Sequence, residues 1–180
     1  EYKSGLIENI PGCPGIINNF GIPSFLVEER YGDVFLCPTF DTNSKLGKYI
    51  SDLLKTKYII STVSNDMIGI EYSSSLKNIS SIMVGIAHGL GYGDNFLSVL
   101  ISHCSKEMSD FIKDVHKTNR KINQSAYLGD LLVTTYSSFS RNRTFGNMIG
   151  KGYSIKSAKA EMDMIVEGYY ATKNASLISK

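Results

Sequence analysis

The sequence predicts an α+β chain in which a strand–helix–strand segment precedes an all-helical domain. All four prolines, the last of them Pro38, lie in the first part, together with runs rich in β-branched and aromatic residues. From Asp66 onward there is no proline, and apolar residues recur at helical spacing. We therefore expect residues 1–65 to be the remnant of an α/β domain and residues 66–180 to be a helical domain.

Three strands and one helix are expected in the first part. The strands are residues 22–27, 34–40 and 58–63, with the prolines near their ends or at an edge. The helix starts at Asp41 to Asn43 and carries apolar residues at helical spacing, namely Leu46, Ile50, Leu53 and Leu54. This order fits the edge of an α/β sheet.

Two apolar stripes predict long helices in the second part. The first is Leu76, Ile79, Met83, Ile86, Ala87 and Leu90, and the second is Phe96, Leu97, Leu100, Ile101, Met108 and Phe111. Residues 129–135 and 155–166 predict further helical segments. Between these two segments we expect a loop punctuated by glycines, namely Gly146, Gly150 and Gly152.

The glycine-rich segment 89–95 predicts a tight helix–helix turn. Its third glycine comes one position too early for a dinucleotide fingerprint, and the segment before it is helical rather than a strand. It is therefore weak evidence for nucleotide binding.

The net charge, the cysteines and the histidines argue against several classes of function. The net charge of +2 argues against a strongly basic nucleic-acid binder, and no apolar run reaches the roughly 18 residues of a membrane span. The cysteines, at positions 13, 37 and 104, are odd in number and widely spaced, which favours a reducing, cytoplasmic compartment over a disulfide scaffold. The histidines, at positions 88, 103 and 116, are 15 and 13 residues apart, so we expect structural or solvated roles and no metal site.

Lys77 stands among small hydroxyl residues. In a helix, its neighbours three and four positions away are all serines, at positions 73, 74, 80 and 81. This stripe leaves the ammonium with hydroxyl acceptors and no adjacent carboxylate. Two interpretations remain open from the pattern, a solvated lysine on a polar helix face or a general acid/base.

A second polar group follows later in the chain. In a helix, Asp130 and Thr134 share one face at a spacing of four residues, and two of the four arginines lie in the tripeptide Arg141-Asn142-Arg143. An arginine fork beside an amide suits a phosphate or a polyol, because the guanidinium donates to pairs of oxygens. The alternative is a surface loop capped by arginine.

An ordered series of motifs resembles the NAD(P)-dependent glycerol-3-phosphate dehydrogenases. It runs through Pro23-Ser24-Phe25, residues 65–71, Leu76-Lys77-Asn78, residues 89–95, Gly129-Asp130-Leu131, residues 140–146 and Val166-Glu167-Gly168. The resemblance implies a Rossmann-like β-α-β edge followed by an all-α domain like the C-terminal domains of 6-phosphogluconate dehydrogenases. It also implies NAD(P)H-dependent, reversible reduction of dihydroxyacetone phosphate to sn-glycerol 3-phosphate, which supplies glycerophospholipid synthesis, in a cytoplasmic homodimer with no nucleic-acid partner.

The resemblance implies a role for each matching residue. Lys77 matches the lysine that exchanges a proton with the carbinol oxygen, and Asp130 and Thr134 match groups that hold the substrate and this lysine. Matches to other substrate contacts are Ser24, Ser140, Arg141 and Asn142, and matches to NAD or NADP contacts are Leu26, Arg141, Ile165 and Glu167.

Some positions depart from the family pattern, and parts of the pattern have no counterpart. The departures are Ile22, Leu26, Ser75, His88 and His103, and no GxGxxG turn or second active-site lysine is found. We therefore expect a fragment, short at its C-terminus as well, that is inactive in isolation and leaves the choice between NAD and NADP open. The alternatives are a non-catalytic helical dimerisation or binding module, and another 3-hydroxyacid dehydrogenase.

Overall fold

The computed structural model describes residues 48–49, 51–53, 55–57, 63–64 and 66–178. Its internal contacts divide the chain into two units, Glu1–Met67 and Ile68–Lys180. In the first unit, residues 48–49 and 51–53 are helical and lie within the helix predicted after Asp41. The strands predicted at 22–27 and 34–40, and all of 58–63 except Val63, lie outside the described residues.

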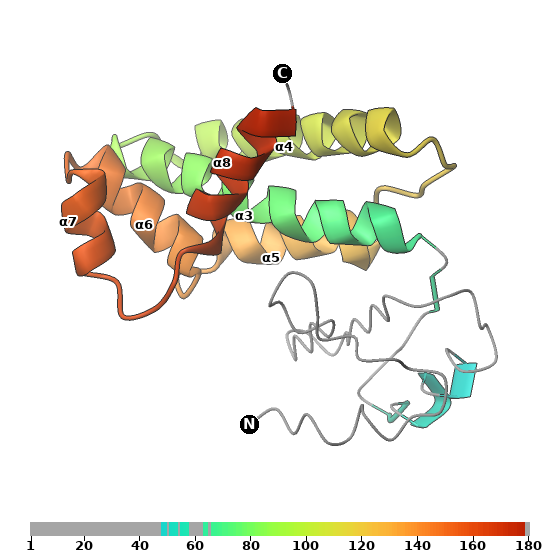
Figure 1. Ribbon diagram of the computed structural model, residues 1–180. Coiled ribbons are helices and arrows are strands. Elements are labelled where there is room, and N and C mark those ends of the chain that lie inside the picture. Colours follow the sequence, from blue (N-terminus) through green and yellow to red (C-terminus); the bar gives the residue numbers. More distant parts are fainter. Residues whose placement is uncertain (1–47, 50, 54, 58–62, 65, 179–180) are drawn as a thin grey trace. The chain divides into compact units, whose positions relative to one another are not determined.

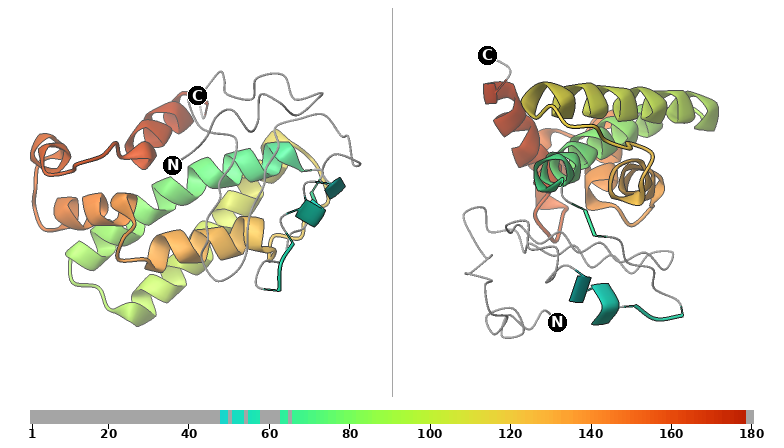
Figure 2. Two further views of the ribbon diagram at one scale, coloured as in Figure 1. Left: turned by 90° about the horizontal axis from the view of Figure 1, so that it is seen from below. Right: turned by 90° about the vertical axis from the view of Figure 1, so that its right-hand side faces the viewer.

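The second unit consists of helices. In chain order these are α3 (Met67–Gly89), α4 (Asp94–Val115), the π-helix η1 (Ser125–Gly129), α5 (Asp130–Tyr136), α6 (Arg141–Gly150), α7 (Ile155–Ala160) and α8 (Glu167–Ile178). Figure 1 shows α4 above α3 and α5 below it, with α6 following α5, and Figure 2 shows that α3, α4 and α5 pack around one another. In the described part of the chain, no helix combines the length and apolar composition needed to cross a bilayer.

Two apolar clusters hold the helices together. The larger joins α3, α4, η1 and α5 through Val84, Ala87, Leu97, Ile101, Cys104, Met108, Ile112, Tyr127 and Leu131. The smaller joins α6, α7 and the start of α8 through Phe145, Ala158 and Val166. The apolar stripe predicted for α4 supplies much of the first cluster, because Leu97, Ile101 and Met108 are each at most 3% exposed.

The tight turn predicted at 89–95 is confirmed. Helix α3 ends at Gly89 and α4 begins at Asp94. Between them Gly91 has a φ of 91°, a left-handed conformation that glycine adopts without the steric cost that a Cβ imposes.

The prediction that Gly146 and Gly150 belong to a loop is wrong, because both lie within α6. A Cβ on Gly146 would overlap the carbonyl oxygen of Ile82, and a Cβ on Gly150 would overlap that of Ile86. On α3, Gly85 and Gly89 face the backbone of α6 in the same way. These glycines therefore allow close backbone approach between two helices. Of the three glycines predicted to lie in the loop, Gly152, with a φ of 94°, is the one that marks a turn.

The ends of the later helices also differ from the prediction. The helix predicted over 155–166 ends at Ala160, and α6 and α8 were not predicted. Their sequences are polar and contain glycine, so they lack the apolar spacing that indicates a helix. Tertiary packing stabilises these two helices instead, because Phe145 of α6 and Val166, just before α8, are buried in the smaller cluster.

Candidate functional site

Lys77 and Asp130 form a buried ion pair between α3 and α5. The Lys77 Nζ donates to Asp130 Oδ1 at 2.7 Å, and the two side chains are only 5% and 8% exposed. Removing two charges from water is costly, and the loss is offset only when the charges pair closely. The geometry therefore holds the ammonium in a water-poor setting with one fixed anionic partner.

The interpretation of Lys77 as a solvated lysine is wrong. The stripe on its own helix offers no carboxylate, and the one beside it, Asp130, comes from α5. The serine and lysine face of α3 is the buried one, because Ser73 and Ser81 have no exposure. By contrast, Met83 and Leu90 from the predicted apolar stripe are 39% and 62% exposed. Small side chains let neighbouring helices approach this face closely, so burial there follows packing rather than hydropathy.

Asp130 owes its position to the π-helical turn before it. The wide turn η1 ends at Gly129 and runs directly into α5, of which Asp130 is the first residue. Tyr127 within η1 is 2% exposed and anchors the turn in the larger core cluster. A carboxylate in the first turn of a helix is also favoured by the helix dipole.

Helix α6 presents the predicted anion-binding residues at its N-terminus. Ser140 is its N-cap, and the Ser140 hydroxyl accepts a hydrogen bond from the Arg143 amide at 3.4 Å. Arg141 and Asn142 are the first two residues of the helix, so they lie where unpaired backbone N–H groups favour an anion. The Arg141 side chain is 40% exposed.

An asparagine pair joins the lysine to this helix end. Asn78 follows Lys77 on α3, and Asn142 Nδ2 donates to Asn78 Oδ1 at 3.0 Å. Asn142 Oδ1 in turn accepts from the Gly168 amide at 2.9 Å, which satisfies one N–H in the first turn of α8. Lys77 is the chain neighbour of Asn78, and Arg141 is the chain neighbour of Asn142. The hydrogen bond between the two asparagines therefore links Lys77 to Arg141.

Glu167, whose side chain is exposed, contacts both Asn78 and Arg141. It accepts from Asn78 Nδ2 at 3.2 Å and lies 3.5 Å from the Arg141 guanidinium. Ile165, on the segment before α8, is 69% exposed. Thr134 is buried and its hydroxyl donates to the Asp130 carbonyl, which places it beside the ion pair on α5.

Two of the predicted site residues, Ser24 and Leu26, lie outside the described residues. Two residues absent from the predicted site now join it, Asn78 and Ser81. Asn78 was visible beside Lys77 in the motif, whereas Ser81 showed only as one member of the serine stripe.

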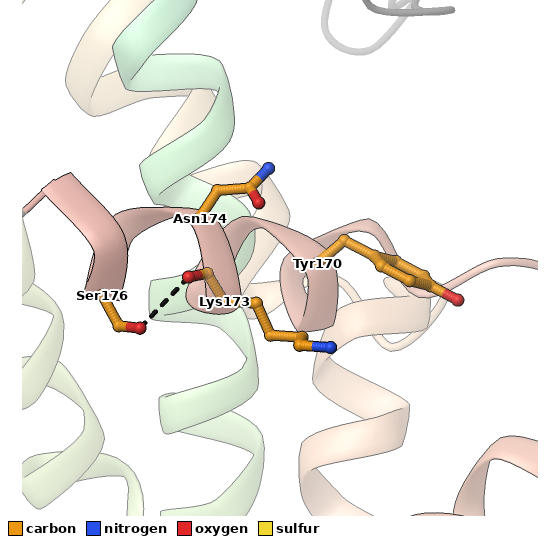
Figure 3. Close-up of a pocket in the computed structure, with 4 residues that line it drawn as sticks. All are labelled: Tyr170, Lys173, Asn174 and Ser176. Carbon is orange, nitrogen blue, oxygen red and sulfur yellow. Dashed lines mark hydrogen bonds between the residues drawn. The ribbon is translucent and has the colours of Figure 1, made fainter.

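In the part of the chain that the structure describes, the remaining polar groups form no second cluster of this kind. His88 Nδ1 lies 2.6 Å from Asn147 Nδ2, and His116 Nδ1 lies 2.8 Å from an Arg120 nitrogen. Among the described residues, no group of three histidine, cysteine or acidic side chains is placed to hold a metal ion. A hollow on α8, shown in Figure 3, is lined by Tyr170, Lys173, Asn174 and Ser176 from that helix alone.

Comparison with known proteins identifies the family. Residues 66–180 match the NAD-dependent glycerol-3-phosphate dehydrogenase C-terminus. The chain belongs to this family. The matched range contains Lys77, Asp130 and the Arg141-Asn142 pair.

Curated relatives and solved structures agree with this membership of the glycerol-3-phosphate dehydrogenase family. A glycerol-3-phosphate dehydrogenase [NAD(P)+] of Fusobacterium nucleatum is 35% identical over 158 residues, which cover 88% of this chain and 47% of the relative. That of Staphylococcus carnosus is 34% identical over 136 residues, covering 76% and 41%. The chain therefore spans about half the length of the curated relatives it matches.

The fold is shared with solved members of the family. The crystal structure of the Coxiella burnetii glycerol-3-phosphate dehydrogenase has a TM-score of 0.72 and 32% identity, covering 77% of this chain and 42% of that one. The structure from Dunaliella salina has a TM-score of 0.67 at 23% identity, covering 74% and 24%, and shows the shared fold alone. The all-helical part of the predicted fold is confirmed.

Proposed function

We propose that this chain carries the substrate-binding half of an NAD(P)-dependent glycerol-3-phosphate dehydrogenase. The reaction is the reversible reduction of dihydroxyacetone phosphate to sn-glycerol 3-phosphate. The observation that carries the proposal is the buried Lys77–Asp130 pair, tied through Asn78 and Asn142 to the arginine at the start of α6. A proton donor and an anion clamp are what a small phosphorylated ketone requires, and the family membership supports the same substrate.

Lys77 acts as the proton donor at the carbinol oxygen. An ammonium has three N–H donors, and the one on Asp130 leaves two for the substrate. The positive charge stabilises negative charge as it develops on the substrate oxygen, and the Nζ proton then passes to that oxygen. Asp130 Oδ1 keeps the ammonium oriented, and in the reverse direction the neutral amine takes the proton back.

Arg141 and Asn142 bind the substrate phosphate. The planar guanidinium donates two parallel hydrogen bonds to phosphate oxygens, which fixes orientation as well as adding affinity. Its present contact with Glu167 is long, at 3.5 Å, and the side chain is partly exposed, so the fork remains accessible. The backbone N–H groups at the start of α6 add to the attraction.

The described residues also fit one edge of a nicotinamide cofactor site. NAD(P)H, when bound, supplies the hydride. The exposed Arg141 guanidinium suits an oxygen-rich cofactor, and the exposed Ile165 can cover an apolar ring face. Glu167 orients Arg141 from the start of α8, and Leu26 is proposed as a further contact.

The wider assignments follow from this proposal. Residues 1–65 form the trailing β-α-β edge of a Rossmann-like cofactor domain, and residues 66–180 form the substrate domain. We propose a homodimer in the cytoplasm that supplies glycerophospholipid synthesis, with the wide cysteine spacing in support of a reducing compartment.

The test compares Lys77→Ala with Lys106→Ala in the complete gene product. Lys106 forms a similar 2.6 Å ion pair with Asp110, but on the exposed surface. Oxidation of NADH with dihydroxyacetone phosphate is expected to fall about 100-fold or more in Lys77→Ala, the scale of a lost general acid. Lys106→Ala is expected to keep the parent rate.

An unchanged rate in Lys77→Ala would contradict the role of this lysine. Preference for 6-phosphogluconate or hydroxyisobutyrate over dihydroxyacetone phosphate would instead favour another 3-hydroxyacid dehydrogenase. Absence of turnover with all three substrates would favour a non-catalytic module.

A further inference from the structure

Ser81 connects three helices through its hydroxyl group. It lies on α3 one turn after Lys77 and has no exposure to solvent. The Ser81 Oγ donates to the Thr134 carbonyl oxygen at 3.0 Å, near the end of α5. The Ser81 Oγ also lies 3.0 Å from the Oγ of Ser140, which is the N-cap of α6.

The direction of these hydrogen bonds is fixed by counting protons. A hydroxyl has one proton, and that of Ser81 goes to the Thr134 carbonyl. Ser140 therefore donates its own proton to Ser81 Oγ, while Ser140 Oγ accepts from the Arg143 amide. The result is a one-way chain from the Arg143 amide through Ser140 and Ser81 to Thr134.

We propose that Ser81 is a positioning residue for substrate phosphate, acting through the N-cap of α6. The proposal rests on the proposed function, and it extends that function to a residue that touches neither substrate nor cofactor. Ser140 sets where α6 begins, and the next two residues are Arg141 and Asn142. Fixing the Ser140 side chain therefore fixes the start of the helix that carries the guanidinium.

The neighbouring Ser80 provides a matched control. It is also buried, at 8% exposure, and precedes Ser81 on the same helix. Its hydroxyl donates to the Leu76 carbonyl at 3.1 Å within α3 and also hydrogen-bonds with the Cys104 thiol of α4, and neither contact reaches α6. Removing it leaves the link to α6 in place.

Packing and hydrogen bonding are separated by two variants of Ser81. Ser81→Ala removes the hydroxyl and shrinks the side chain. Ser81→Cys keeps the space filled but offers only a weak donor and acceptor. If the hydrogen bonds matter, the two variants behave alike, whereas a packing effect is relieved in Ser81→Cys.

The experiment measures steady-state kinetics and amide hydrogen exchange in the complete gene product. We expect Ser81→Ala and Ser81→Cys to raise the KM for dihydroxyacetone phosphate about tenfold, the upper range for one lost hydrogen bond. The kcat is expected to change by less than about twofold, because the Lys77–Asp130 pair is untouched. Exchange of the Arg143 amide is expected to accelerate in both Ser81 variants, while Ser80→Ala matches the parent in every measurement.

Each outcome has a distinct meaning. Unchanged exchange at Arg143 in Ser81→Ala overturns the hydrogen-bond chain, and faster exchange with an unchanged KM overturns the positioning role. An equal fall of kcat in Ser80→Ala and Ser81→Ala also overturns it, because the effect is then general to α3. If the parent protein does not turn over dihydroxyacetone phosphate, the proposed function fails, and the Arg143 exchange still decides whether Ser81 holds the cap.

Discussion

Lys77 Nζ and Asp130 Oδ1 lie 2.7 Å apart at the contact of α3 with α5, although 53 residues separate them in the chain. Both side chains are almost fully buried. The pair therefore matters for stability, beside the chemistry proposed for it, since neither charge has water to replace its partner.

Asp130→Asn is expected to lower the free energy of unfolding by about 3–5 kcal/mol, because it leaves an unpaired buried ammonium. Urea denaturation followed by circular dichroism measures this. The double variant Lys77→Met with Asp130→Leu is expected to recover most of the loss, since it removes both charges. Asp110→Asn, which breaks the exposed pair with Lys106, is the control and is expected to leave the midpoint unchanged. A double variant no more stable than Asp130→Asn would refute this account.

Gly85→Ala and Gly146→Ala are expected to destabilise the helical unit. Alanine is intrinsically better than glycine in a helix by about 1 kcal/mol, so the local effect alone would be stabilising. The new Cβ, however, would overlap the Arg143 carbonyl oxygen in one case and that of Ile82 in the other. Thermal melting of Gly129→Ala, where the nearest side-chain atom is 3.4 Å away, gives the comparison. A rise in melting temperature for Gly85→Ala or Gly146→Ala would exclude close contact between α3 and α6.

Cys104 is expected to resist alkylation in the native protein. Burial raises the pKa of the Cys104 thiol, so less of the reactive thiolate is present at any given pH, and the side chain is only 2% exposed. Iodoacetamide treatment at neutral to mildly alkaline pH, with mass spectrometry of the peptide that contains Cys104, measures the modified fraction. Labelling is expected to become rapid in urea. Equal labelling with and without urea would show that α4 does not bury this residue.

Asn142→Asp is expected to weaken substrate binding more than it affects chemistry. The substitution replaces the donor to Asn78 Oδ1 with a second acceptor and adds negative charge beside the proposed phosphate site. The KM for dihydroxyacetone phosphate should rise about tenfold or more, as for a lost hydrogen bond with added repulsion. Asn147→Asp is the matched control on the same helix, where the side chain meets His88 instead. An equal KM in the two variants would separate Asn142 from phosphate recognition.

The order of motifs and much of the helical architecture could be predicted from the sequence. The residues proposed for chemistry, Lys77 and Asp130, were both found by pattern and resemblance, and the structure brings them into contact. The turn at Gly91 was also predicted, because it depends on only a few neighbouring residues. The strand edge proposed for residues 1–65 remains a prediction.

The burial of α3 could be predicted only in part from its own sequence. Ala87 of the predicted apolar stripe is buried, but Met83 and Leu90 of the same stripe are exposed. Lys77, for which the pattern left a solvated position open, is buried. The reason is that serines at positions 73, 80 and 81 are small enough for other helices to pack against. The hydroxyls of Ser73 and Ser81 are satisfied by distant partners that the local sequence does not reveal, the carbonyls of Ala126 and Thr134.

The sequence by itself determined which residues are available, where Gly91 turns the chain, and that Lys77, Asp130 and Arg141 occur in the order of a known family. These properties depend on local backbone preference or on the order of residues along the chain. The tertiary structure alone decided that Gly85 and Gly146 bring two helices into backbone contact. It also decided that Ser81 joins α3 to the cap of α6, because such a contact requires atoms 59 residues apart to meet within a buried interface.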